Sequence, residues 1–290
     1  MATSYVEKSE KPPDMIPTTP PSEAVCLLEW KEKDGVPYIG TGFLAQDQDS
    51  KQVYWMTAGH NLENLDLCNP EMPEEQKIRC EDYFIRFAHT KHINRLYKMN
   101  LSDFFQICNF QKDKILFKRP LNDDKVNADF MIVPLGDTLE SLREKFDKID
   151  AIPIAKDKTF KESAKDDFYV LGHPTTNNKE VIQKFSRGTL SEPEELKANC
   201  RKEERRIEIE KMKSSKLFHT VDTDKGSSGS PLMFYRHNQW NVVGIHVGGL
   251  DKISFQPRRH ANYAESILPL VRKEQEGGKP ILSQTQLNQT

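Results

Sequence analysis

Short apolar runs, many of them rich in β-branched and aromatic residues, recur along the chain between turn-forming Gly, Asp and Pro residues. This pattern is typical of short antiparallel strands in a sandwich or a barrel. We expect strands near residues 25–30, 38–45, 52–57, 82–87, 129–135, 167–172, 217–221 and 240–246. The chain is therefore predicted to be an all-β protein.

Helical periodicity occurs in two places. Residues 138–146 read as one helix, and residues of about 264–275, interrupted by Pro269, read as a C-terminal helix. The first 22 residues are polar and proline-rich, a composition that buries too little apolar surface to fold alone, so we expect disorder there. The tail 277–290 is expected to be flexible.

Residues 191–216 form an intensely charged segment. Its alternating acidic and basic residues predict a solvated insertion, with the binding of a charged partner as the alternative.

The overall charge gives no reason to expect a nucleic acid or membrane partner. Charged residues make up 30% of the 290 residues, yet the net charge is only -2. The basic runs at 112–119 and 201–206 are interleaved with acidic residues, which disfavours nucleic-acid binding. Without a signal-like or membrane-spanning apolar stretch, we expect a cytoplasmic protein. Its oligomeric state is left open.

The cysteines indicate free thiols in a reducing compartment. They are odd in number and form no CxxC pair, so no disulfide framework is expected. A metal site at Cys68, Cys80, His89 and His92 is an alternative, but the spacing lacks the close ligand pairs of structural zinc sites. We expect neither a metal nor a cofactor.

Two motifs supply a base and a carboxylate. His60 ends the apolar run in Thr57-Ala-Gly-His60, where an imidazole can face a cleft, and Asp129 precedes the apolar run 130–135. A buried carboxylate is costly unless paired, and a histidine is a natural partner. Each residue alone has an ordinary structural explanation.

A third motif, Asp224-Lys-Gly-Ser-Ser-Gly-Ser-Pro231, is more specific. Gly226 and Gly229 permit a tight turn around Ser228, in which the N–H groups of Gly226 and Ser228 converge as an oxyanion hole requires. The run that follows ends in Gly248 and Gly249, which leave room for a substrate strand to pair.

Taken in order, these motifs resemble the trypsin/chymotrypsin superfamily of serine peptidases. The resemblance extends from about residue 25 to 270, and includes Tyr38-Ile-Gly-Thr-Gly-Phe43, Val170-Leu-Gly-His-Pro174 and Ser186-Arg-Gly-Thr-Leu190. It implies a peptidase domain over 23–276, built from two six-stranded antiparallel β-barrels at about 23–137 and 150–262. It also implies a triad of His60, Asp129 and Ser228, acting on proteins or peptides.

Departures from digestive trypsins move the chain toward other branches of the superfamily. Asn61 replaces the usual cysteine after the histidine, and Ser227 replaces the aspartate that captures a new N-terminus in activated zymogens. Zymogen activation through that ion pair is therefore not expected. The pattern is closer to bacterial glutamyl endopeptidases and to the chymotrypsin-like proteases of picornaviruses.

The same resemblance bears on P1, the substrate residue before the cleaved bond. In those two groups a threonine and a histidine, here Thr223 and His246, bind a P1 Glu or Gln side chain, and both can donate to its oxygen. Asp222 instead occupies the position at which trypsins bind P1 Lys or Arg. We expect an endopeptidase with P1 Glu/Gln preference. The alternatives are P1 Lys/Arg preference through Asp222 and a non-catalytic protein that binds peptides by strand pairing.

Overall fold

The structure is a computed structural model. It describes residues 19–31, 35–65, 77–87, 98–118, 128–146, 149–163, 165–175, 181, 183–200, 202–213, 215–250 and 261–268. The predicted segment 277–290, most of the segment 1–22, and Cys68, His89 and His92 of the alternative metal site lie outside these residues.

The first half of the chain forms one sheet, in the order β5-β4-β1-β2-β3-β7-β6, with β8 paired to β2. Among the strand pairs of this sheet in the described residues, β2–β8 is the parallel one. The strands are β1 (Val25–Lys31), β2 (Pro37–Gln46), β3 (Val53–Thr57), β4 (Phe84–Phe87), β5 (Lys98–Asn100), β6 (Leu116–Lys118), β7 (Phe130–Pro134) and β8 (Ile152–Pro153).

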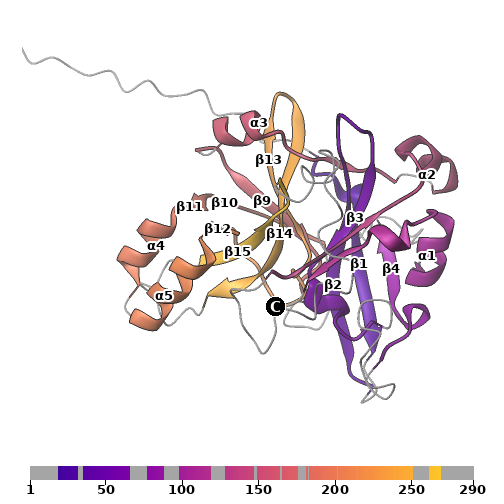
Figure 1. Ribbon diagram of the computed structural model, residues 1–290, viewed down its shortest axis with the longest axis horizontal. Coiled ribbons are helices and arrows are strands. Elements are labelled where there is room, and N and C mark those ends of the chain that lie inside the picture. Colours follow the sequence, from indigo (N-terminus) through magenta and orange to yellow (C-terminus); the bar gives the residue numbers. More distant parts are fainter. Residues whose placement is uncertain are drawn as a thin grey trace, which may run out of the picture.

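The second half forms an antiparallel sheet in the order β10-β9-β13-β14-β15-β12-β11, beside the first sheet (Figure 1). Its strands are β9 (Phe168–Gly172), β10 (Lys184–Gly188), β11 (Leu190–Ser191), β12 (Lys216–His219), β13 (Pro231–Arg236), β14 (Gln239–Leu250) and β15 (Ala261–Ser266). His237 and Asn238 join β13 to β14 with φ of 53° and 59°, the backbone of a tight hairpin turn.

Helices cover the outer sides of the two sheets. In Figure 1, α1 and α2 flank the first sheet, α4 and α5 flank the second, and α3 lies above it. The helices are α1 (Leu101–Ile107), α2 (Leu139–Lys145), α3 (Asp157–Glu162), α4 (Pro193–Asn199) and α5 (Glu203–Met212), with short 3₁₀ turns at Ser22–Ala24, Gly59–Leu62, Cys80–Asp82 and Lys112–Lys114.

The architecture confirms the predicted all-β class and the chymotrypsin-like arrangement of two halves. The strand number differs, because short strands extend the two sheets to eight and seven strands. The helix predicted at 138–146 is α2, capped by the Thr138 side chain. The helix predicted at 264–275 is wrong at its start, since residues 264–266 belong to β15 and pair with β12 and β14. Residues 269–275 of that prediction lie outside the described residues.

A shared core joins the two sheets. Strand β3 is buried on both faces: Met56 points into a cluster that also contains Phe168, Leu232 and Val242 of the second half. Trp55, on the opposite face, belongs to a cluster within the first half that α1 and α2 help to close. Because β-strand side chains alternate between faces, one strand can serve both cores.

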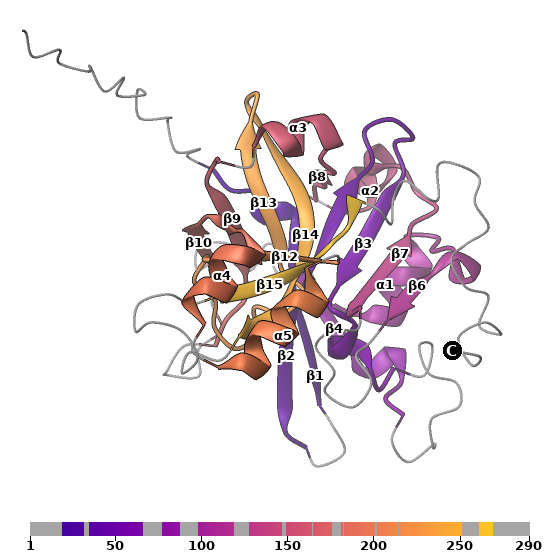
Figure 2. The ribbon, with the colours of Figure 1, turned by 60° about the vertical axis from the view of Figure 1, so that its left-hand side comes forward.

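The charged segment 191–216 contains the hairpin α4–α5, which packs on the second sheet (Figure 2). Four of its residues, Leu196, Cys200, Ile209 and Met212, are buried in a cluster with Phe218, Val247, Leu250, Ala261 and Tyr263. The segment is thus anchored by apolar contacts as well as solvated on its outer side.

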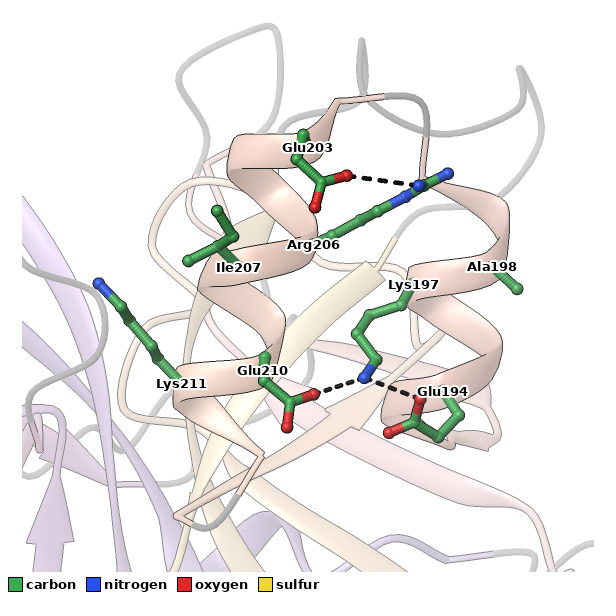
Figure 3. A pocket seen from close by; sticks show the side chains of 8 residues that line it. All are labelled: Glu194, Lys197, Ala198, Glu203, Arg206, Ile207, Glu210 and Lys211. Atoms are coloured by element: carbon green, nitrogen blue, oxygen red, sulfur yellow. Dashed lines mark hydrogen bonds and ion pairs between the residues drawn. The ribbon is translucent and has the colours of Figure 1, made fainter.

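The charges of the hairpin largely satisfy one another. A groove between the helices is lined by Glu194, Lys197, Ala198, Glu203, Arg206, Ile207, Glu210 and Lys211. Figure 3 shows Lys197 between Glu194 and Glu210, and Arg206 pairs with Glu203. Within the described residues of the hairpin, these acidic and basic side chains therefore pair with one another at the surface.

Candidate active site

The residues around His60 form a tightly packed turn at the end of β3. Ala58 is extended, and the backbone then enters a 3₁₀ turn at Gly59–Leu62. A Cβ atom on Gly59 would lie 2.0 Å from the Lys118 carbonyl oxygen and 3.0 Å from Asp129 Oδ1. Only glycine therefore allows the chain to approach this closely and bring His60 beside Asp129.

Asp129 binds His60 at two points. Its Oδ2 lies 2.7 Å from His60 Nδ1, and its Oδ1 accepts the His60 backbone N–H at 2.8 Å. Asp129 is only 2% exposed, whereas 37% of the His60 side-chain surface is exposed. The carboxylate thus fixes both the backbone and the ring of His60, and favours the tautomer that carries its proton on Nδ1.

Two opposing effects act on the His60 pKa. Burial lowers it, but the hydrogen bond and the charge of Asp129, together with the charge of Glu63, outweigh burial and raise the pKa above its ordinary value. A raised pKa means that Asp129 stabilises the imidazolium, which is the form that a general base adopts after taking a proton.

The loop that carries Ser228 is held by residues of the first sheet. The Ser228 carbonyl oxygen accepts hydrogen bonds from the Thr41 backbone N–H at 2.8 Å and from the Asn61 Nδ2–H at 2.9 Å. Gly226 and Gly229 have φ of +96° and +90°, a conformation that favours glycine. At Gly229 a Cβ would also lie 1.9 Å from the Thr41 carbonyl oxygen.

The Ser228 hydroxyl donates to the Val247 carbonyl at 3.1 Å. Within the part of the chain that the structure describes, no hydrogen bond joins it to His60, and the N–H groups of Gly226 and Ser228 have no acceptor. Unpaired N–H groups in a glycine-bounded turn are suited to binding an oxyanion. Val247 directly precedes Gly248 and Gly249, so the hydroxyl contacts the segment predicted to bind a substrate strand.

His246 lies on β14 beside a second histidine. Its Nδ1 is 3.2 Å from His219 Nε2, and the two residues are 2% and 0% exposed. Burial, with a smaller effect of the His60 charge, lowers the pKa of His246 to about 3, and burial lowers that of His219 as well. Both rings are therefore neutral at ordinary pH.

Asp222 does not lie in a buried position. Its side chain is 65% exposed, and Lys184 Nζ of β10 lies 3.3 Å from it and 3.1 Å from Asp224. The carboxylate therefore neither remains unpaired in the interior nor contacts His246. Thr223, the next residue, is half-buried, and its hydroxyl has no hydrogen-bond partner in the described part of the chain.

The family model described as trypsin-like peptidase domain matches residues 40–245. The chain belongs to this family. No curated protein matches it. A trypsin-like peptidase domain acts on proteins or peptides, and the segment matched contains His60, Asp129 and Ser228.

Several residues around the candidate site have contacts that the sequence does not predict. Asn61 gives only the signal of an absent cysteine in the sequence, and Glu265, whose Oε1 accepts the Asp129 N–H at 2.6 Å, lies in the segment predicted as a helix. His219 and Lys184 gave no local signal, because their roles depend on pairing between distant strands. The described residues contain no group of three side chains that could hold a metal ion, and none of their helices is long and apolar enough to span a membrane.

We predict that Asp129→Asn lowers the His60 pKa below its ordinary value. The amide has no charge to hold the imidazolium, so burial becomes the dominant effect. Proton NMR titration of the imidazole measures this shift. In the parent, the Asp129–His60 interaction should stabilise the fold fully below the ordinary histidine pKa, and lose this contribution as the pH rises through the raised value. An unchanged titration in Asp129→Asn would contradict the assignment.

We predict that Asn61→Asp destabilises the fold by about 1–3 kcal/mol, because Asn61 is 3% exposed and a carboxylate cannot donate to Thr57 Oγ1 or the Ser228 carbonyl. Chemical denaturation measures the change. The matched control is Asn238→Asp at an exposed turn, which should stay within about 0.5 kcal/mol of the parent. Equal effects of the two substitutions would show that the Asn61 contacts carry no stability.

Proposed function

We propose that this protein is a serine endopeptidase in which Ser228 is the nucleophile, His60 the general base and Asp129 the residue that orients the base. The observation that carries the proposal is the double contact of the buried Asp129 carboxylate with the N–H and the ring of His60. A structural ion pair needs only one of these contacts. The pair fixes the direction in which His60 presents Nε2.

Catalysis would proceed through an acyl-enzyme. His60 Nε2 takes the hydroxyl proton as Ser228 Oγ attacks the substrate carbonyl, and then gives that proton to the leaving amine. Water, deprotonated by the same nitrogen, releases the acyl group and restores the serine. Ser228 Oγ must first leave the Val247 carbonyl, which a rotation of its side chain achieves. Apo structures often lack the nucleophile–base contact that substrate brings about.

The turn at Gly226–Gly229 would stabilise the tetrahedral intermediate. The free N–H groups of Gly226 and Ser228 are proposed to bind the oxyanion, and Thr41 and Asn61 hold this loop to the half that carries His60. Removing one such donor in other enzymes lowers kcat by about 10²- to 10³-fold.

Glu or Gln is the proposed P1 side chain, as in the glutamyl endopeptidases and picornavirus proteases that the motif resembles. A neutral His246 whose Nδ1 accepts a hydrogen bond from the His219 Nε2–H carries its own hydrogen on Nε2. That N–H and the Thr223 hydroxyl can both donate to a carboxylate or amide oxygen, and Gly248 and Gly249 can pair with the substrate backbone. The Lys184 partner of Asp222 disfavours the alternative, a P1 Lys or Arg held by Asp222.

We predict that a fluorophosphonate probe labels the folded protein at Ser228, and that Ser228→Ala and His60→Ala abolish labelling. The matched control is Ser227→Ala, because Ser227 is the adjacent serine and its hydroxyl instead accepts the Asp224 N–H. This control should still be labelled. Intact labelling of Ser228→Ala would show that another residue is the reactive nucleophile. No labelling and no peptide turnover by the folded parent would favour the non-catalytic peptide-binding alternative.

We predict that a peptide library shows cleavage after Glu and Gln, and that His246→Ala lowers kcat/KM for these substrates by at least about tenfold. Asp222→Asn is the control, since an exposed side chain paired with Lys184 should leave the profile unchanged. Cleavage after Lys and Arg that disappears in Asp222→Asn would establish the trypsin-like alternative instead.

A further inference from the structure

The backbone N–H of Asp129 is bound by a carboxylate from the other half of the molecule. Asp129 precedes β7 in the first sheet, whereas Glu265 lies on β15 in the second. Glu265 Oε1 accepts the Asp129 N–H at 2.6 Å, and both residues are at most 3% exposed. The residue that orients His60 is thus itself held from across the junction between the sheets.

A buried lysine compensates the charge of Glu265. Lys216 of β12 stands directly opposite Glu265 in the β12–β15 register, and its ammonium bonds to the same Oε1. The two side chains are 0% and 4% exposed. Burial, with a smaller effect of the Asp129 charge, raises the pKa of Glu265 above its ordinary value. The charge and hydrogen bond of Lys216 and the Asp129 N–H oppose this rise.

The hairpin α4–α5 helps to keep this pair out of water. Lys216 begins β12 soon after α5 ends at Met212, and Met212 packs in the cluster that also contains Tyr263. The Tyr263 ring lies 5.8 Å from Lys216 Nζ. An ion pair in such a dry site depends on complete pairing, because an unpaired buried charge is very costly.

We propose that Glu265 is a positioning residue for the catalytic aspartate: its carboxylate, held in place by Lys216, fixes the backbone of Asp129 and thereby the contact between Asp129 and His60. This inference rests on the proposed function. Asp129 uses both carboxylate oxygens on His60, so a shift of its backbone moves the ring directly. Small misplacements of catalytic groups reduce rates by up to about 10²-fold.

The experiment compares two double variants that both lack the buried charges. Glu265→Gln/Lys216→Met keeps an oxygen that can accept the Asp129 N–H, whereas Glu265→Leu/Lys216→Met removes the acceptor. Apolar replacement of both members of an ion pair is often tolerated by folding. Thermal unfolding verifies that each variant is folded, and NMR titration of His60 and the pH profile of kcat/KM then follow the site. Two other charged residues act on His60, namely Asp129 and Glu63, and both are unchanged in the two variants.

The leucine variant should show kcat lower by about 10- to 100-fold with little change in KM. Its His60 pKa should fall, because a displaced Asp129 stabilises the imidazolium less, and the acid limb of the pH profile should move to lower pH. The glutamine variant should have a kcat and a His60 pKa close to those of the parent. A residue that acts only on stability would change the unfolding temperature and leave the His60 pKa in place.

Equal His60 pKa values and equal kcat in the two folded variants would overturn the proposal. If the leucine variant does not fold, Glu265→Met/Lys216→Met replaces it, because methionine is closer in shape to glutamine and also lacks the acceptor. A His60 pKa lower than in the glutamine variant supports the acceptor role, and an equal pKa contradicts it. The NMR measurement needs no substrate. A failure of the proposed peptidase activity would therefore be seen separately from a failure of this inference.

Discussion

The site depends on burying one carboxylate, that of Asp129, at the junction of the two sheets. A buried carboxylate is unfavourable unless its oxygens are occupied, and here His60 occupies both, through its backbone N–H and its ring. The same contacts that make burial tolerable also orient the imidazole and raise its pKa. Stability and proposed chemistry therefore rest on the same atoms, and Gly59 leaves the space in which they meet.

The two halves of the molecule hold each other's functional loops. Thr41 and Asn61 of the first half bind the carbonyl of Ser228 in the second, while Glu265 of the second half binds the N–H of Asp129 in the first. A core shared by both sheets fixes their relative position. Because close-packed interiors adjust little, these reciprocal hydrogen bonds can hold a nucleophile and a base whose sequence positions are far apart.

The region beside Ser228 contains a neutral histidine pair in the interior and a group of paired charges at the surface. His246 and His219 form a buried, neutral pair, and Lys184 binds the carboxylates of Asp222 and Asp224 at the surface. Under the proposed P1 assignment, His246 and Thr223 would supply hydrogen-bond donors, while Asp222 and Asp224 are paired with Lys184. The hairpin α4–α5 packs behind the same strands and covers Val247 and Tyr263. The segment 191–216, which the sequence predicts to be a solvated insertion, thus also covers part of the second sheet.

The sequence by itself determined the all-β class and most of the longer strands, because strand periodicity is a local feature. Its ordered motifs also singled out His60 and Asp129, which the structure brings into contact, and Ser228 as the proposed nucleophile. It misassigned residues 264–266, whose apolar spacing fits a helix but whose pairing with β12 and β14 makes them a strand. Only the tertiary structure decided that Asp222 turns to Lys184, that Asn61 reaches Ser228 and that Glu265 reaches Asp129. Each of these contacts joins residues at least 38 positions apart, so the packing of the two sheets creates them and no local pattern records them.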